Sequence, residues 1–273
     1  MDHDIERSKP LRPVHMFWHG SALSRLERLC ISSFIANGHD VLLHVYDLPA
    51  GVPKRTQIID AAKTLPSSKL FRDKRRGSLA SFADWFRFQV LHDQGGIWAD
   101  MDVVCLKPLT YERDEIFGWE DHATVNIAVL GLPAKHELAA WMLECWRHPN
   151  RILPYDSPKN RKRKLLRRLR LGNSRRYVRW GEFGPQGFTD AVKHLGYVDL
   201  AKPFWHFYPI HFSNWHSIFD RSLEGCAGMT ESSFALHLWN EMSRRAPGFD
   251  KNRTFEPESL FEQLCARFLK SDS

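Results

Sequence analysis

Short apolar runs alternate with longer helical segments over the first hundred residues of the chain. The runs at residues 14–20 and 40–47 end in turn or polar residues, which predicts two buried strands. Between them, apolar positions at helical spacing over residues 24–38 predict a helix, and Ser24 and Glu27 have the spacing of a capping box at its start. The chain therefore begins as an alternation of strand and helix.

The same alternation continues toward residue 100. We expect a helix at about 56–64, stopped by Pro66, and a mostly buried helix over residues 79–94. Gly95 and Gly96 then form a turn that leads into a strand carrying two aspartates. This order indicates an α/β fold with a parallel sheet, in which ligands bind at the carboxyl ends of the strands.

The pattern is less regular after residue 110. Further strands are expected at 116–120 and 126–132, and further helices at 136–147, 185–195 and 258–270. The chain has no internal repeat and no linker between two periodic regions. We therefore expect residues 1–273 to form one domain.

Composition narrows the class of protein. The chain has 273 residues, of which 43% are hydrophobic and 12% aromatic, so it can bury a sizeable core. The five cysteines are widely spaced and suit reduced thiols better than a disulfide framework; they are Cys30, Cys105, Cys145, Cys226 and Cys265. No signal peptide or membrane-spanning run is visible, which favours a cytoplasmic protein.

Positive charge is concentrated in one segment. Residues 159–179 contain eleven basic and no acidic residues, more than the whole net charge of +7, so the remainder of the chain is net acidic. Leucines among these basic residues predict an amphipathic helix that could lie on an anionic membrane, peripheral to the inner face of the plasma membrane. The alternative is a solvated flap, either a lid over a ligand or a groove for an acidic glycan. A nucleic-acid partner is not expected, since no nucleic-acid motif accompanies the charge.

Two charged residues lie on one side of the helix predicted at 79–94. Asp84 and Arg87 are three residues apart, which suits an intrahelical ion pair. The alternative is a carboxylate and a guanidinium directed into a pocket, where substrate hydroxyl groups need an acceptor and a donor. The position of the pair just before the aspartate-bearing strand favours the pocket.

The two aspartates follow that helix in the sequence WADMD. On an extended strand Asp100 and Asp102 would point to the same face, with Trp98 beside them. Two adjacent carboxylates repel unless a hard cation such as Mn²⁺ or Mg²⁺ neutralises them. An isolated DxD is a weak signal, because it also occurs in solvated loops and in phosphatases of another fold.

The combination of these residues is more specific. It resembles the nucleotide-sugar site of glycosyltransferases with the DXD sugar-binding motif, the family 32 enzymes related to α-1,4-galactosyltransferases and to the glucosylating domains of large clostridial toxins. The matching residues are Ser81, Asp84, Arg87, Gly95, Gly96, Trp98, Asp100 and Asp102. The family usually has tyrosine or phenylalanine at the position of Trp98, a mild departure that keeps an aromatic wall.

Other segments extend the resemblance from about residue 13 to residue 241. FWHG is similar to the family's first strand, which assigns the contact with the nucleotide base to Trp18 or, as the second candidate, Phe17. The segment 125–138 resembles the region after the metal motif and would direct Asn126 toward the donor sugar. WGEFGPQGFTDAV, at 180–192, is similar to a WGxxGPxxxT element of the α-1,4-galactosyltransferase-like members. The basic insert 159–179 has no counterpart in this pattern.

ALHLWNE, at 235–241, resembles the family's closing histidine–tryptophan motif. By this resemblance His237 is a third metal ligand or a contact to the diphosphate, although a single histidine is more often structural. Trp239 and Asn240 would line the same diphosphate pocket. The metal ligands implied are therefore Asp102, Asp100 and His237.

The resemblance implies a GT-A fold, which is Rossmann-like with a mixed central sheet, as in nucleotide-diphospho-sugar transferases. Residues 13–110 would form the nucleotide-sugar half, and residues 111–273 the acceptor half with the basic insert. The implied activity is retaining, metal-dependent transfer of a hexose, with a UDP-sugar as the expected donor. The acceptor would be a glycan or glycolipid in the synthesis of cell-surface polysaccharide or lipopolysaccharide.

The resemblance also implies catalytic roles. Asp102 would hold the cation, while Asp100 would contact the ribose or share the metal through water. Asp84 and Arg87 would bind hydroxyls of the donor sugar. Two rival functions are a phosphate-ester hydrolase, which would need a nucleophilic aspartate that FWHG does not supply, and a non-catalytic relative, against which the intact acidic and basic residues argue.

Overall fold

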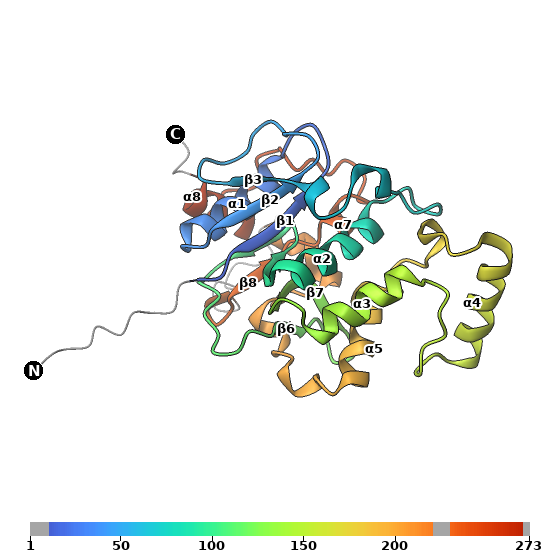
Figure 1. Ribbon diagram of the computed structural model, residues 1–273. Coiled ribbons are helices and arrows are strands. Elements are labelled where there is room, and N and C mark those ends of the chain that lie inside the picture. The colour runs from blue at the N-terminus through green and yellow to red at the C-terminus, as the bar shows by residue number, and fades with distance from the viewer. Residues whose placement is uncertain (1–10, 221–229, 270–273) are drawn as a thin grey trace, which may run out of the picture.

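The computed structural model describes residues 11–220 and 230–269, and its centre is a six-stranded sheet in the order β3-β2-β1-β4-β7-β6 (Figure 1). The strands of this sheet are β1 (Val14–Trp18), β2 (Val41–Val45), β3 (Gln57–Asp60), β4 (Gly96–Ala99), β6 (Ile116–Trp119) and β7 (Val125–Leu132). The first four are parallel, whereas β7 pairs antiparallel with both β4 and β6. The α/β fold with a mixed central sheet is thus confirmed, and the purely parallel sheet is wrong for the strands after residue 110.

Helices cover both faces of the central sheet. They are α1 (Arg25–Ala36), α2 (Ala80–Gln94), α3 (Glu137–Arg147), α4 (Pro158–Leu171), α5 (Pro185–Leu195), α7 (Asn240–Ser243) and α8 (Leu260–Phe268). Helices α2, α3 and α5 pack together on one side, and α1 and α8 on the other. Helix α4 projects from the body at the right of Figure 1. Among the described residues, no helix combines the length and apolar character needed to cross a membrane.

The predicted helix at 56–64 is wrong in its first half. Residues 57–60 form the edge strand β3, whose Ile58 pairs with Leu43 of β2. Isoleucines at 58 and 59 favour an extended chain because their branched side chains are restricted in a helix. Only a short 3₁₀ turn, Ala61–Lys63, follows, and the Asp60 side chain caps it.

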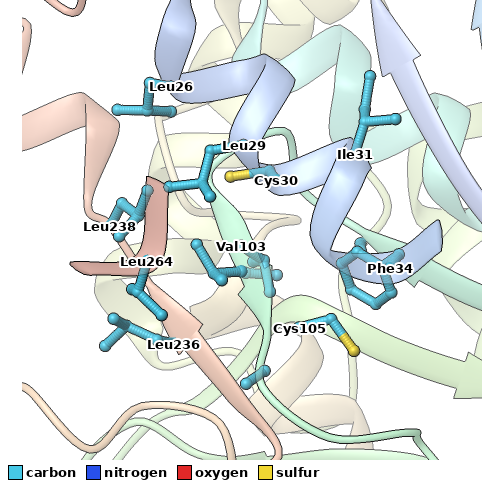
Figure 2. Packing of buried hydrophobic residues seen from close by; sticks show 14 of the residues in the cluster. Leu26, Leu29, Cys30, Ile31, Phe34, Val103, Cys105, Leu236, Leu238 and Leu264 are labelled. Carbon is cyan, nitrogen blue, oxygen red and sulfur yellow. The ribbon is translucent and has the colours of Figure 1, made fainter. Parts of the chain in front are cut away.

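A second, two-stranded sheet joins distant parts of the chain. β5 (Val103–Cys105) pairs antiparallel with β8 (Ala235–His237). Figure 2 shows Leu29 and Cys30 of α1 near Val103, and Leu26, Leu236 and Leu264 lie in the same cluster. Burying this apolar surface fixes β5 beside α1 and fixes β8 beside β5.

The strand expected to carry both aspartates is interrupted. β4 ends at Ala99, Asp100 to Asp102 form a turn, and β5 begins at Val103 in the other sheet. The interruption follows from pairing, because β4 pairs with β7 while β5 pairs with β8. The DXD turn therefore links the two sheets.

Gly95 provides the turn that precedes β4. Its φ of +70° lies in the region that favours glycine, and a Cβ here would lie only 2.7 Å from the backbone nitrogen of Ala134. The described cysteines are free and buried, as expected for reduced thiols; they are Cys30, Cys105, Cys145 and Cys265. Cys226 lies outside the described residues.

Candidate functional site

A cavity of about 1100 Å³ opens where β1 and β4 end. Its walls come from the end of β1, helix α2, the DXD turn, β7, the inner side of α4, the start of α5 and the segment after β8. A ligand in this cavity would lie at the carboxyl edge of the parallel strands, the usual position in open α/β sheets.

Three possible metal ligands meet on one side of the cavity. Asp100, Asp102 and His237 each offer a ligand atom, and these atoms all lie within 4.8 Å of one another. The small sheet brings them together, because Val103 pairs with His237 and the N–H of Leu238 donates to the Asp102 carbonyl at 2.8 Å. A carboxylate pair with an imidazole is a suitable donor set for a divalent cation.

Asp102 is the most strongly held of these side chains. The backbone N–H of Asn240 donates to its Oδ2 at 2.8 Å, and Nε2 of His237 lies 3.2 Å from the same oxygen. Burial raises the pKa of Asp102, but the opposing charge and hydrogen bond of His237 outweigh burial and leave the pKa below its ordinary value. Conversely, burial lowers the pKa of His237, and Asp102 outweighs it and raises the pKa.

Two buried polar atoms beside this cluster lack a partner within the described chain. They are Nδ1 of His237 and Oδ1 of Asn240. Burying such atoms unpaired is costly unless a bound group completes them. The donor set and these orphaned atoms fit a site that holds a cation or a polar ligand.

Asp100 has a different environment. Its Oδ1 accepts hydrogen bonds from Nη2 of Arg87 and from Nε1 of Trp98, each at 2.7 Å. Burial raises the pKa of Asp100, and Arg87 opposes that rise. Trp98 therefore does more than form an aromatic wall, since its indole N–H fixes the carboxylate, which a phenylalanine at this position could not do.

The two alternatives for Asp84 and Arg87 are both realised. Nη2 of Arg87 lies 3.5 Å from Oδ1 of Asp84, and both side chains line the cavity. Burial raises the pKa of Asp84 to about 7. A Cβ on Gly184, at the start of α5, would lie 2.9 Å from Oδ2 of Asp84, so this glycine makes room for the carboxylate.

The aromatic candidates after β1 differ in their surroundings. Trp18 is half-buried at the cavity, and its indole nitrogen has no partner in the described chain. Phe17 also lines the cavity, but its ring stacks on Phe86 at 4.7 Å between centroids and belongs to the core. These surroundings favour Trp18 as the ring that is available to a ligand.

Asn126 lies in the cavity wall but is already engaged. Its Nδ2 donates to Oε2 of Glu120 at 2.5 Å, and its Oδ1 accepts from the N–H of Ala128 at 2.7 Å. Glu120 also lines the cavity, and burial raises its pKa. Sequence reasoning missed Glu120, whose only signal is its place at the end of the predicted strand 116–120.

Trp239 and Asn240 close the far side. The Trp239 indole N–H donates to the carbonyl of Ile210 at 2.8 Å, and the Trp239 backbone has φ +54° and ψ +46°. A left-handed tryptophan is unusual and signals local strain. This conformation turns the chain so that the next N–H, that of Asn240, points at Asp102.

The basic insert also reaches the cavity. From the sequence, a position over a ligand was one of two alternatives for this segment. Asn160, Arg163 and Lys164 of α4 are among the lining residues. The inner side of α4 therefore forms part of the cavity wall.

Two family models match the chain. The model described as "Glycosyltransferase sugar-binding region containing DXD motif" matches residues 28–122, and the model described as "Alpha 1,4-glycosyltransferase conserved region" matches residues 176–271. The chain is a glycosyltransferase with a DXD sugar-binding region. The expected family and enzyme class are thereby confirmed.

The two matched regions of this glycosyltransferase meet at the cavity, because the first contains the DXD turn and the second contains His237. Among solved structures, the enzyme is similar to one named "PaToxG Glycosyltransferase", at 17% sequence identity and a TM-score of 0.43, covering 68% of this chain and 69% of that chain. A comparison with curated proteins gave no match. Helix α4 lies between the two matched regions.

Proposed function

We propose that the enzyme transfers a hexose from a nucleotide sugar, with UDP-sugars as the expected donors, to a glycan or glycolipid acceptor with retention of configuration. The reaction would serve the synthesis of cell-surface polysaccharide or lipopolysaccharide. The observation that carries the proposal is the meeting of Asp100, Asp102 and His237 within 4.8 Å at the wall of a cavity that also contains Asp84 and Arg87.

We assign the metal site to Asp102 and His237, with Asp100 as the third ligand or as a contact to the ribose. Mn²⁺ or Mg²⁺ held there would stabilise the negative charge that develops on the departing diphosphate. The low pKa of Asp102 keeps it ionised and ready to accept a cation. Asn240 and Trp239 would line the space for the diphosphate, since Oδ1 of Asn240 has no partner among the described residues.

The remaining residues would orient the donor. Asp84 and Arg87 present an acceptor and a donor for hydroxyl groups of the sugar, which fixes the anomeric carbon relative to the acceptor. Trp18 would contact the nucleotide base, with Phe17 behind it as part of the core. Trp98 would hold the Asp100 carboxylate in position. Asn126 would face the sugar together with Glu120, to which its side chain is hydrogen-bonded.

Retention needs no protein nucleophile in this scheme. The bond from the anomeric carbon to the diphosphate oxygen breaks, and the acceptor hydroxyl attacks from the same face. Its proton passes to the leaving phosphate oxygen, so charge and atoms balance without a further base. The role of the protein is then to position the reactants and to stabilise charge.

The donor class can be tested without knowing the acceptor. We would incubate the enzyme with Mn²⁺ and a panel of UDP- and GDP-sugars, and measure slow donor hydrolysis and thermal stabilisation. One donor is expected to be preferred, and Asp102→Ala is expected to remain folded and to lose hydrolysis. Asp199→Ala, at an exposed position on another part of the chain, is the matched control. Full turnover by Asp102→Ala would contradict the metal assignment.

The charge of the insert supports a proposal for the place of reaction. We propose that residues 159–179 hold the enzyme against the inner face of an anionic membrane, where glycolipid acceptors are available. Each basic residue near such a surface contributes about 1 kcal/mol to the free energy of membrane binding.

A further inference from the structure

Helix α4 is oriented with charged side chains inward and apolar side chains outward. Lys164 and Arg167 are its buried residues, whereas Leu165, Leu166 and Leu169 are exposed at 52%, 42% and 82%. This is the reverse of the usual surface helix, whose apolar face packs on the core. Two features therefore need an explanation: how charged side chains are stabilised on the inner face, and why leucines are exposed on the outer face.

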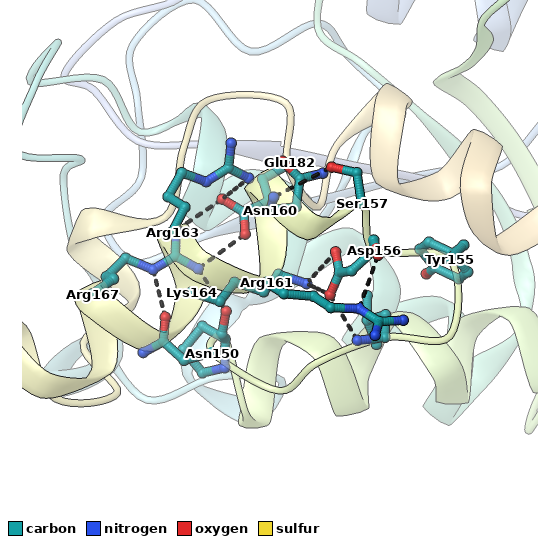
Figure 3. Close-up of polar contacts among 12 residues, drawn as sticks. Asn150, Tyr155, Asp156, Ser157, Asn160, Arg161, Arg163, Lys164, Arg167 and Glu182 are labelled. Atoms are coloured by element: carbon teal, nitrogen blue, oxygen red, sulfur yellow. Dashed lines mark hydrogen bonds and ion pairs between the residues drawn. The ribbon is translucent and has the colours of Figure 1, made fainter.

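The inner face is held by ion pairs, which Figure 3 shows. Nζ of Lys164 contacts the two carboxylate oxygens of Asp156 at 2.7 and 3.0 Å. The guanidinium of Arg167 binds both carboxylate oxygens of Glu182, at 2.8 and 2.9 Å, and donates to Asn150. Each buried charge has a partner, so α4 has a fixed rotation about its axis and its leucines are held outward.

The outer face combines apolar and basic side chains. Leu165 and Leu169 are one turn apart, and Leu166 lies beside them. The exposed basic residues around these leucines are Lys159, Lys162, Arg168 and Arg170, whereas Nε of Arg161 donates to the Asp156 carbonyl at 3.0 Å. No acidic residue occurs in 159–179.

We propose that this outer face docks on an anionic phospholipid membrane, with Leu165, Leu166 and Leu169 inserted at the interface and the surrounding basic residues on the headgroups. A helix with an apolar ridge and a basic border has the composition of interfacial helices. The charge selects an anionic surface, and the exposed leucines supply the apolar contact that a purely electrostatic patch lacks.

Other occupants suit the face less well. A second copy of the chain would bring two helices with the same positive charge together, which is repulsive. A nucleic acid would use the basic residues but would leave the leucines in water. The docking itself does not depend on the proposed donor, acceptor or metal site. It does place the cavity within about a helix diameter, roughly 10 Å, of the membrane, which suits the glycolipid among the proposed acceptors.

The test is co-sedimentation with vesicles of phosphatidylglycerol and phosphatidylcholine, compared with phosphatidylcholine alone. The natural protein is expected to bind the anionic vesicles only. Leu165→Gln/Leu166→Gln/Leu169→Gln is expected to weaken binding by about tenfold or more, and Lys159→Gln/Lys162→Gln/Arg168→Gln/Arg170→Gln by at least as much. None of these residues lines the cavity, so donor hydrolysis in solution should be unchanged.

Matched controls use exposed residues elsewhere. Leu48→Gln removes a leucine that is 71% exposed, and Lys54→Gln/Lys63→Gln/Lys69→Gln/Arg113→Gln removes four exposed charges; both should bind like the natural protein. Equal binding to neutral vesicles, or full binding by the triple leucine variant, would overturn the proposal. So would a dimer that the leucine variant loses in the absence of vesicles. Vesicle binding without turnover of any nucleotide sugar would instead count against the proposed function alone.

Discussion

Nε2 of His237 lies 3.2 Å from Oδ2 of Asp102, and the pairing of β5 with β8 holds the two residues together. The small sheet creates this contact, because β5 begins directly after Asp102 and β8 ends at His237. The other ring nitrogen of His237, Nδ1, is buried without a partner in the described chain. The pairing of β8 with β5 therefore does more to hold the imidazole in place than hydrogen bonds to its ring do.

Replacing this histidine tests the third ligand. His237→Ala is expected to lower the affinity for Mn²⁺ in the presence of UDP by about 10- to 100-fold. Loss of a residue that only hydrogen-bonds to a metal ligand already has an effect of this size, so loss of a ligand should have at least as large an effect. Isothermal titration calorimetry measures the affinity. His216→Ala changes an exposed histidine and should leave it unaltered. An unchanged Mn²⁺ affinity in His237→Ala would remove the histidine from the ligand set.

The close approach of Gly184 to Asp84 gives a second prediction. Gly184→Ala places a methyl group 2.9 Å from the present position of Oδ2 and should displace the carboxylate. Donor hydrolysis is expected to fall by about tenfold or more, because small misplacements of orienting groups are costly. The melting temperature should change little.

A double variant separates displacement from general damage. In the Asp84→Ala background the methyl group of Gly184→Ala meets no carboxylate, so the second substitution should add little to the loss of hydrolysis. If the two effects multiply, Gly184 acts independently of Asp84 and the explanation is wrong.

The hydrogen bond from Trp98 to Asp100 gives a third prediction. Trp98→Phe keeps an aromatic ring but removes the indole N–H, leaving Arg87 as the remaining side-chain donor to Oδ1. The free energy of unfolding should fall by about 1 kcal/mol or more, measured in urea. Slower donor hydrolysis should accompany this loss. Hydrolysis and stability equal to those of the natural protein would show that the hydrogen bond is unimportant.

The buried ion pair under α4 gives a fourth prediction. Lys164→Met leaves Asp156 buried without its cation and should lower the free energy of unfolding by about 3–5 kcal/mol in urea. Lys164→Met/Asp156→Asn removes the stranded charge, while the amide oxygen can still accept the Leu153 N–H. The double variant should therefore recover part of the stability, and a double variant less stable than Lys164→Met would contradict this account.

A buried histidine pair predicts how stability depends on pH. Nδ1 of His15 lies 2.9 Å from Nε2 of His44, and burial lowers the pKa of His15 to about 4. Burial and the neighbouring His15 lower the pKa of His44 to about 3. The Phe86 ring lies against His44 and the backbone at Gly95 contacts His15, and among the described residues no carboxylate raises the pKa of either ring.

The sign of the effect follows from these directions. The unfolded chain takes up protons near pH 6.5, whereas the folded pair does not until the pH approaches 4. The contribution of the pair to stability should therefore be constant well above pH 6.5 and fall below it, by about 2.5 kcal/mol for each histidine at pH 4.5. The raised pKa of Asp84 acts with the opposite sign over the same range, so the pair is isolated by comparing melting temperatures of the natural protein and His44→Gln between pH 7.5 and 4.5. His44→Gln should lose less stability on acidification than the natural protein, and parallel curves for the two proteins would rule out the pair as the cause.

Much of the fold could be predicted because the signals were local. Capping by Ser24 and Glu27, the glycines before β4 and the apolar runs are each decided by neighbouring residues. The edge strand β3 was missed, since four residues of an exposed strand have no clear period and depend on the partner strand. The interrupted DXD strand was missed for a related reason, because it is the pairing with β7 and β8 that ends one strand and begins the next.

The residues of the candidate site also fall into those marked by a local sequence pattern and those that depend on distant partners. Asp84, Arg87, Asp100 and Asp102 carried a recognisable spacing, and they line one cavity. Glu120 had no spacing to mark it. The direction of the α4 leucines depends on Asp156 and Glu182, whose pairing with the helix cannot be deduced from periodicity. A helical pattern identifies the two faces of a helix, but only its partners decide which face turns inward.

The DXD turn joins the central sheet to the small sheet, and the small sheet is completed by a strand from near the end of the chain. A ribosome that has released residue 110 has therefore made the aspartates but not the histidine that faces them. The cluster of Asp100, Asp102 and His237 cannot assemble until β8 has emerged and paired with β5, so the two aspartates wait for a strand that is made much later than the DXD turn.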